Sequence, residues 1–321
     1  MAMGYLYLPF LLFVFGCAAV EKKSEVTSEA NVTSVISFQL HDNRMLIPVM
    51  INGKGPFTFV FDTGGGRTNT ITPEAAKKLE LVLVEGIPVK GAGSNRALSW
   101  KTKVDQYLVG NLVLKDQSFT VIDLSSIKKA FNFQNLDGII GLDVLKKAVA
   151  CIDFDKQILK LSSGEINCFD TKGVVLPFEL DGRTPAIAGS ISGIPGKIVI
   201  DTGDRSAFSI FQKFSLKNNI ENKFVDKPLV VTGVGVGGVI RAKLAVLAEI
   251  KLGDEITLNK VLSRRPYTIG NYFATSTAAG SIGNEVLRRF NLILDYNKYE
   301  ITFIKNSHFS EPYTFVPPKL D

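Results

Sequence analysis

Histidine is nearly absent from this sequence of 321 residues, in which only His41 and His308 occur. Neither lies at a metal-ligand spacing from a cysteine or from the other histidine, so no metal site is predicted. A Ser-His-Asp triad would need one of them, and no serine lies in a Gly-x-Ser-x-Gly motif. We therefore expect both histidines to be surface or structural residues.

Clusters of basic residues are also missing. The net charge is +6, but the 37 lysines and arginines are spread along the chain. No basic cluster is interleaved with aromatic side chains, as is typical of nucleic-acid-binding surfaces. The sequence therefore predicts no nucleic-acid partner. An apolar fraction of 45% with 21% charged residues is typical of a folded globular protein.

The apolar run at the N-terminus, residues 5–15, is too short for a membrane-spanning helix but suits the core of a signal peptide. It leads to Val14-Phe15-Gly16-Cys17, which resembles a bacterial lipobox. We expect a signal peptide at 1–16, lipidation of Cys17 and a polar tether at 17–33. This anchor would hold the protein on a membrane of the bacterial cell envelope, facing the periplasm or the exterior. The alternative is an ordinary exported protein in which Cys17 is incidental.

The tripeptide Asp-Thr-Gly occurs twice, as Asp62-Thr63-Gly64 and as Asp201-Thr202-Gly203. An apolar, strand-like run precedes each copy, at residues 57–61 and 197–200. One copy alone would be weak evidence for a site, because Asp and Gly are common in turns that follow strands. Two copies in similar surroundings indicate two equivalent aspartates, one from each half of the chain.

The surroundings of the two tripeptides do repeat. The second tripeptide follows the first by 139 residues, and later matches are offset by 142 because three residues are inserted before the second Gly-x-Gly segment. The matched segments are 38–40 with 178–180, 91–93 with 233–235, 137–141 with 279–283, 144–147 with 286–289, and 153–156 with 295–298. An internal duplication is therefore predicted, with units of about 130 residues.

Short alternating apolar runs and frequent glycines predict a mostly β protein. Helix signals are few. Thr72 and Pro73 supply a cap and a first-turn proline, and residues 144–147 and 286–289 predict one or two further turns in each half. The glycine-rich residues 233–238 lead into a strand-like run. They are therefore predicted to form a hairpin tip and not a nucleotide-binding loop, and no cofactor is expected.

Cys151 and Cys168 remain if Cys17 carries lipid. An exported protein permits a disulfide between them, which would close a loop of ~18 residues and contribute roughly 3 kcal/mol in the chain-entropy model. Cys151 also aligns with Ile293 in the duplication, so a buried apolar side chain is the alternative. The sequence leaves both alternatives open.

Asp62 and Asp201 suit a mechanism that needs two carboxyl groups. Two carboxylates within hydrogen-bond reach cannot both ionise easily, so one pKa falls and the other rises, and the pair titrates as a unit. The ionised member accepts a proton from a water that attacks a peptide carbonyl, and the protonated member supports the oxyanion. The glycine after each Asp-Thr lets the backbone pack closely across the pair.

With these motifs the chain resembles the aspartic protease superfamily, and bacterial retropepsin-like aspartyl proteases in particular. Each Asp-Thr-Gly is followed by its own copy of a hydrophobic-hydrophobic-Gly element, which is Ile139-Ile140-Gly141 in the first half and Ser281-Ile282-Gly283, with serine at its first position, in the second. Residues 70–81 also resemble the segment after the active aspartate in single-lobe members. The resemblance covers about residues 34–306. It implies an N-terminal lobe at 34–165, a C-terminal lobe at 166–306 and a tail at 307–321.

The resemblance implies a bilobal pepsin/retropepsin-like fold, with two homologous β-barrel-like lobes and a cleft in which Asp62 faces Asp201. Thr63 and Thr202 would exchange hydrogen bonds across the lobe interface, and Gly64 and Gly203 would complete the support of the dyad. The implied activity is that of an aspartic endopeptidase that acts on peptides or unfolded proteins. Since both lobes belong to one chain, a monomer suffices.

The resemblance also implies flaps over the cleft, which would close on an extended peptide bound by β-augmentation. The expected flap residues are Gly91, Ala92, Gly93 and Ser94 in the first half, and Gly233, Val234 and Gly235 in the second.

Two residues differ from the family pattern, in which Ser, Thr or Ala usually follows Asp-Thr-Gly. Here the residue is Gly65 in the first half and Asp204 in the second. Gly65 cannot donate a side-chain hydrogen bond to the neighbouring carboxylate. Asp204 adds negative charge near the dyad unless it points away or pairs with Arg205. Both differences favour an alternative function, a catalytically impaired peptide-binding module of the cell envelope.

Overall fold

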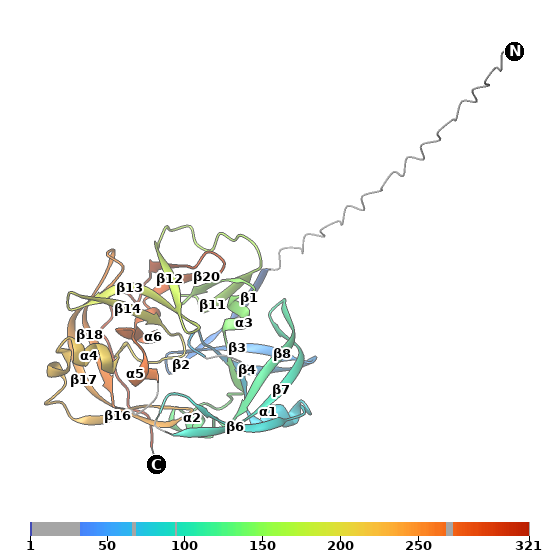
Figure 1. Ribbon diagram of the computed structural model, residues 1–321, viewed down its shortest axis with the longest axis horizontal. Helices are drawn as coiled ribbons and strands as arrows, with labels where there is room; N and C mark the ends of the chain where they lie inside the picture. Colours follow the sequence, from blue (N-terminus) through green and yellow to red (C-terminus); the bar gives the residue numbers. More distant parts are fainter. Residues whose placement is uncertain (2–32, 66–68, 94, 268–271, 321) are drawn as a thin grey trace. The chain divides into compact units, whose positions relative to one another are not determined.

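The computed structural model describes residues 1, 33–65, 69–93, 95–267 and 272–320 (Figure 1). All of these except Met1 belong to one unit, Asn31–Asp321. The expected signal peptide, Cys17, the tether up to residue 32 and the flap residue Ser94 lie outside the described residues. Within the described part of the chain, no helix is long and apolar enough to cross a membrane.

The strands between residues 39 and 140 form one sheet (Figure 1). In spatial order its eight strands are β2 (Gln39–His41), β3 (Arg44–Ile51), β4 (Lys54–Phe61), β9 (Gly138–Ile140), β5 (Asn69–Ile71), β8 (Leu112–Ile122), β7 (Arg96–Val109) and β6 (Val84–Lys90). Strand β4 lies inside the sheet and pairs in parallel with β9. The strand that leads to Asp62 is therefore supported on both edges.

The second sheet has thirteen strands and contains all the strands of the second half. In spatial order they are β1 (Thr33–Ser37), β11 (Ile158–Ser162), β10 (Val149–Asp153), β20 (Phe290–Asp295), β21 (Glu300–Lys305), β12 (Val174–Asp181), β13 (Thr184–Ile191), β14 (Ile194–Ile200), β19 (Gly280–Ile282), β15 (Phe208–Ile210), β18 (Ile256–Pro266), β17 (Gly238–Leu252) and β16 (Leu229–Gly235).

The two halves share one strand order. The series β13-β14-β19-β15-β18-β17-β16 repeats β3-β4-β9-β5-β8-β7-β6, and β14 pairs in parallel with β19 as β4 does with β9. The mostly β fold predicted from the sequence is confirmed. Each copy of this strand order forms one lobe, which we call the N lobe and the C lobe.

The two lobes join through six antiparallel strands, β1-β11-β10-β20-β21-β12. Strands β10 and β20 are the equivalent strands of the two halves, and Cys151 lies directly opposite Ile293. Cys151 and Ile293 also align with each other in the duplication, so equivalent residues of the two copies pair directly in the sheet. Strands from both halves therefore form one continuous platform.

Helices are short. They are α1 (Pro73–Lys78), α2 (Ser125–Ala130), α3 (Leu142–Leu145), α4 (Gln212–Lys217), α5 (Tyr272–Thr275), α6 (Asn284–Leu287) and the 3-10 helix η1 (Ile220–Lys223). Helix α1 begins as predicted, because the Thr72 hydroxyl accepts a hydrogen bond from the Ala75 N–H at 3.3 Å. The turns predicted at 144–147 and 286–289 are present as α3 and α6, each beginning two residues earlier.

The strands that lead to the Asp-Thr-Gly turns are apolar on both faces. In β4, Phe59 and Phe61 pack into the main core while Val60 packs into a second cluster on the opposite face. In β14, Ile198 and Ile200 likewise lie in the main core, and Val199 lies in a small cluster opposite. A strand covered on both faces has a continuous apolar run and no alternation, which explains the runs at 57–61 and 197–200.

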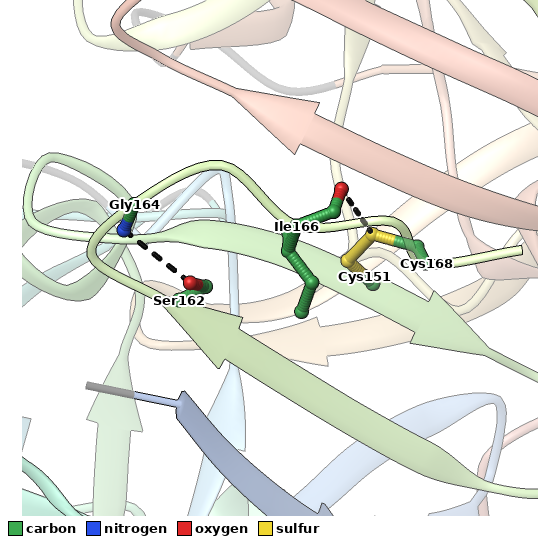
Figure 2. Close-up of a disulfide and its surroundings, with 5 residues drawn as sticks. All are labelled: Cys151, Ser162, Gly164, Ile166 and Cys168. Carbon is green, nitrogen blue, oxygen red and sulfur yellow. Dashed lines mark hydrogen bonds between the residues drawn. A yellow bond between two sulfur atoms is a disulfide. The ribbon is translucent and has the colours of Figure 1, made fainter. Parts of the chain in front are cut away.

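Cys151 and Cys168 form a disulfide with a Cα–Cα distance of 5.9 Å (Figure 2). Cys151 lies on β10, and Cys168 lies in the connection between β11 and β12. This connection also bends back on itself, since the Gly164 N–H donates to the Ser162 hydroxyl at 3.3 Å. The disulfide therefore fixes the segment that links the two lobes to the platform they share.

The tail after β21 has no regular secondary structure up to residue 320. It contacts both lobes. The Val316 carbonyl accepts a hydrogen bond from Nη1 of Arg205 in the C lobe at 2.8 Å, and the Lys319 N–H donates to the carbonyl of Ala130 in α2 at 3.0 Å. The tail is thus a strap between the lobes.

Candidate active site

The two Asp-Thr-Gly turns lie against each other, with the glycine of each turn next to the carboxyl group of the other lobe. Each turn also holds its own carboxyl group. The Gly64 N–H donates to Oδ1 of Asp62 at 2.7 Å, and the Gly203 N–H donates to Oδ1 of Asp201 at 2.9 Å. Two aspartates that are 139 residues apart in sequence therefore form one dyad.

The hydrophobic-hydrophobic-Gly elements support the backbone of both aspartates. The Asp62 N–H donates to the Ile140 carbonyl at 2.8 Å, and the Asp201 N–H donates to the Ile282 carbonyl at 3.0 Å. A Cβ on Gly141 would overlap the Asp62 carbonyl. This close approach explains why a glycine follows the two hydrophobic residues.

Thr63 and Thr202 form a reciprocal set of four hydrogen bonds between the lobes. The Thr63 N–H donates to the Thr202 hydroxyl at 3.0 Å, and the Thr202 N–H donates to the Thr63 hydroxyl at 3.0 Å. Each hydroxyl donates in turn to the opposite strand, to the Ile200 carbonyl at 2.7 Å and to the Phe61 carbonyl at 2.9 Å. Both threonines are at most 2% exposed, so water does not compete for these bonds.

Gly64 and Gly203 each face the carboxyl group of the other lobe. A Cβ on Gly64 would lie 2.6 Å from Cγ of Asp201, and a Cβ on Gly203 would overlap the carboxylate of Asp62. Neither position has room for a side chain, and the two turns can approach only because both residues are glycine.

The dyad is held in an environment that disfavours two negative charges. Burial raises the pKa of Asp62, and the hydrogen bond from Gly64 opposes this rise. Burial raises the pKa of Asp201 well above its ordinary value, and the nearby carboxyl groups of Asp62 and Asp204 raise it further. Because the two groups are coupled, their titration belongs to the pair.

Arg44 crosses from the N lobe to the turn of the C lobe. Its Nε donates to the Gly203 carbonyl at 3.1 Å, and its Nη1 pairs with Asp42 at 2.5 Å. Its guanidinium lies 4.5 Å from the centre of the Phe131 ring, an attractive cation–π contact. The positive charge of Arg44 also lowers the pKa of Asp62. The sequence analysis missed this residue because a single arginine in a strand has no distinguishing pattern.

Asp204 does not pair with Arg205, one of the two arrangements considered from the sequence. Its carboxylate pairs with Nη2 of Arg264 at 2.8 Å, whereas Arg205 forms an ion pair with Asp42 of the N lobe. Although burial disfavours its ionised form, the Arg264 charge and the hydrogen bonds from Ser206 lower the pKa of Asp204. The negative charge next to the dyad is therefore compensated by a residue 60 positions away.

The expected flap residues lie at the tips of two hairpins. Lys90 pairs with Arg96 at the end of the β6–β7 hairpin, and Gly235 pairs with Gly238 at the end of the β16–β17 hairpin. The hairpin tip predicted at 233–238 is therefore confirmed. The tips meet, because the Gly237 N–H donates to the Ala92 carbonyl at 2.7 Å and the Asn95 N–H donates to the Gly237 carbonyl at 2.9 Å.

Beneath their tips the hairpins share an apolar cluster with the strands that flank the dyad. Val234 is buried in this cluster together with Val60, and Ile139 packs against it. Ile139 also borders Asp62, since a Cβ on Gly65 would lie 3.3 Å from Ile139 and 3.4 Å from Cγ of Asp62. The C-lobe hairpin thus reaches the N-lobe side of the dyad.

The two histidines make ordinary polar contacts. Nε2 of His41 lies 2.8 Å from the Phe131 carbonyl oxygen, and Nδ1 of His308 lies 2.7 Å from Oε1 of Glu311. In the described part of the chain, no group of three or more His, Cys, Asp or Glu side chains is placed to hold a metal ion.

A family model described as aspartyl protease matches residues 47–144. This segment contains Asp62-Thr63-Gly64, the first hairpin and the hydrophobic-hydrophobic-Gly element at 139–141. A comparison with curated proteins found no match to the chain. The family match supports the aspartic protease superfamily and a peptidase activity of the aspartic type. It ends before the second Asp-Thr-Gly, so the similarity of the C lobe depends on the repeated motifs and strand order.

Proposed function

We propose that this protein is an aspartic endopeptidase in which Asp62 and Asp201 together activate a water molecule. The observation that supports this most strongly is the close approach of the two Asp-Thr-Gly turns, in which the glycine of each turn lies against the carboxyl group of the other lobe. Two carboxyl groups held this close can share one proton and one negative charge, which is the state that general acid–base catalysis on a peptide bond requires.

In this mechanism Asp201 holds the proton and Asp62 is the base. Each carboxyl group accepts a hydrogen bond from the glycine of its own turn, and Asp204 disfavours the ionised form of both. The assignment therefore follows from Arg44, whose charge favours an ionised Asp62, and from burial, which raises the pKa of Asp201 well above its ordinary value. Asp62 accepts a proton from the water molecule as the water oxygen attacks the scissile carbonyl carbon. Asp201 donates its proton to the carbonyl oxygen, and the pair then returns a proton to the leaving amine.

The substrate is an extended peptide or an unfolded protein segment, bound by one copy of the chain. It would lie between the dyad and the two hairpins and add hydrogen bonds to their strands. Because the tips are hydrogen-bonded to each other, they must separate before a peptide enters and then close over it.

The second candidate, a peptide-binding module without catalysis, has less support. Its sequence argument depended on Gly65 and on the charge of Asp204, and Arg264 compensates that charge. Gly65 has no side chain that could donate a hydrogen bond to Asp62, but the Gly64 N–H already donates one to this carboxylate.

The test is a peptide-library cleavage assay from about pH 3 to pH 8, a range that covers plausible titrations of a carboxyl dyad. The wild type should cleave, while Asp62→Asn and Asp201→Asn should each lose at least about a thousandfold in kcat/KM. Peptide binding without cleavage by the wild type would favour the binding module. Cleavage retained in both variants would contradict the dyad mechanism.

We also propose that the protein is anchored to a membrane of the cell envelope through lipidated Cys17, on the basis of the lipobox-like sequence alone. Incorporation of labelled fatty acid by the full chain, and its loss in Cys17→Ala, would support this. A secreted, unlabelled wild type would contradict it.

A further inference from the structure

The C lobe has a buried ion pair next to the dyad that the mechanism above does not use. Asp204 and Arg264 are 9% and 4% exposed, and Oδ2 of Asp204 lies 2.8 Å from Nη2 of Arg264. Moving two charges out of water is costly unless good geometry and further hydrogen bonds compensate. A pair of this kind immediately after Asp-Thr-Gly suggests a role in the site.

Every oxygen of the Asp204 carboxylate is fixed. Oδ1 accepts hydrogen bonds from the Ser206 N–H at 2.9 Å and from the Ser206 hydroxyl at 2.8 Å. Oδ2 accepts from the Ser209 hydroxyl at 3.2 Å as well as from Arg264. Nε of Arg264 donates to that same hydroxyl at 2.7 Å. The four side chains therefore form one closed network.

This network is hydrogen-bonded to the turn that contains Asp201. The Asp204 N–H donates to Oδ1 of Asp201 at 3.2 Å, and the Asp204 carbonyl accepts from the Asn284 N–H at 2.7 Å. Nδ2 of Asn284 donates in turn to the Thr202 carbonyl at 2.7 Å. A shift of the Asp204 side chain would thus move a hydrogen-bond donor of the catalytic carboxylate.

Arg264 also reaches the second hairpin. It lies on β18, which pairs with β17, and a Cβ on Gly233 of β16 would lie 3.5 Å from Nη1 of Arg264. The guanidinium therefore lies between the Asp201 turn and the base of the β16–β17 hairpin.

The N lobe has a different pair at the equivalent positions. Gly65 follows the first Asp-Thr-Gly, as Asp204 follows the second. Thr70 pairs with Thr120 between β5 and β8 where Ser209 pairs with Arg264 between β15 and β18. Thr120 is therefore the counterpart of Arg264. One lobe has Gly and Thr, and the other has a buried Asp and Arg.

We propose that Arg264 is a positioning residue of the C lobe, which through Asp204 holds the Asp201 turn in place, balances the charge beside the dyad and couples the turn to the second hairpin. This rests on the proposed function. Among the residues that the structure describes, the other charged or titratable groups that face the dyad or Asp204 are Arg44 from β3 and Tyr296 after β20. Both stay unchanged in the variants below.

The test compares Arg264→Thr, Asp204→Gly and the double variant, which installs the pair of the N lobe. In Asp204→Gly the Arg264 guanidinium no longer faces the Asp204 carboxylate and cannot deprotonate, so the pH–rate profile should move to lower pH. In Arg264→Thr the unpaired carboxylate should move it to higher pH, with a loss of roughly tenfold in kcat/KM at pH 4. The double variant should return toward the wild-type profile.

Arg264→Lys is a further control. It keeps the charge but cannot donate through both Nε and Nη2, so its profile should stay in place while kcat falls. If Arg264→Thr does not fold, Arg264→Lys still tests whether Arg264 positions the Asp201 turn. A merely structural pair would lower kcat equally in both single variants, with unmoved profiles and no recovery in the double variant. That result would overturn the proposal.

A readout that does not need catalysis separates this proposal from the proposed function. The 13C NMR titration of the aspartate carboxyl carbons should shift in opposite directions in the two single variants. If the wild type cleaves no peptide but these shifts occur, the endopeptidase assignment fails and the charge coupling stands. If the wild type cleaves and the titration curves coincide with those of the variants, the function stands and Arg264 has no positioning role.

Discussion

Gly64 and Gly203 determine how closely the carboxyl groups of Asp62 and Asp201 approach, because each glycine faces the aspartate of the opposite lobe. We expect Gly64→Ala to push Asp201 away and to lower kcat/KM by at least about a hundredfold, as displacements of about 1 Å do in other enzymes. Gly182→Ala is the control, since a Cβ there meets nothing within 4 Å. Its positive φ of 68° should lower Tm slightly and leave kcat/KM unchanged. Wild-type activity in Gly64→Ala would contradict the close packing of the two turns.

The raised pKa of Asp201 has a consequence for stability. The folded state binds the proton of the Asp201 carboxyl group more tightly than the unfolded chain does, and this raises the free energy of unfolding. The gain is complete below about pH 4, the ordinary range of a carboxyl group. It is lost as the pH rises through the folded-state pKa of Asp201. Asp201→Asn cannot ionise. Its Tm should exceed that of the wild type at pH 7 to 8, and the difference should vanish below about pH 4.

Calorimetric scans at several pH values measure this difference. Asp170→Asn, which replaces an exposed carboxylate in the connection between the lobes, is the control and should change Tm little at any pH. A difference between Asp201→Asn and the wild type that is the same at all pH values would contradict the burial of an ionisable dyad.

Among the elements, the two hairpins are held together by their tips. A Cβ on Gly235 would lie 2.7 Å from Cβ of Ala92 and would overlap the Ala92 carbonyl. Gly235→Ala should therefore separate the tips and accelerate amide hydrogen exchange at Asn95 and Gly237, whose N–H groups form the contact. Gly233→Ala, two residues away on the same strand, meets only ordinary contacts from 3.5 Å and should leave this exchange slow. Equal exchange in both variants would mean that the tips open freely.

Elements with a local pattern could be predicted from the sequence. The Thr72-Pro73 start of α1, the glycine-rich tip of the β16–β17 hairpin and the apolar runs of β4 and β14 all follow from residues within a few positions. The dyad itself was predictable because the duplication placed the same tripeptide after the same strand in both halves. Repetition supplied the long-range information that one half alone lacks.

The contacts that tune the site could not be predicted, because their partners are distant in sequence. Arg44 lies 159 residues from Gly203, whose carbonyl it binds, and Arg264 lies 60 residues from Asp204. The sequence analysis considered Arg205 as the partner of Asp204 because it is adjacent. Adjacent residues in an extended turn point to different sides, however, and Arg205 faces Asp42 of the other lobe.

At the scale of the whole molecule, the lobes are joined by the shared strands, the Thr63–Thr202 exchange, the contacts of Arg44 and Arg205, and the hairpin tips. The tail adds a further connection. Deletion of residues 316–321 removes the Val316–Arg205 and Lys319–Ala130 hydrogen bonds. Two hydrogen bonds, one of them to a charged group, are worth about 2 kcal/mol. We therefore expect Tm to fall by roughly 3 °C, measured by differential scanning calorimetry.

Lys319→Ala removes the lysine side chain and keeps the backbone of the tail, so it tests which of the two connects the lobes. The contact with Ala130 is made by the backbone N–H of residue 319, so this substitution should leave Tm within about 1 °C of the wild type, as is usual for surface positions. If the deletion does not lower Tm, the lobes are held fully by the shared strands and the tail only lies on their surface. If Lys319→Ala lowers Tm as much as the deletion does, the lysine side chain, and not the backbone strap, connects the lobes.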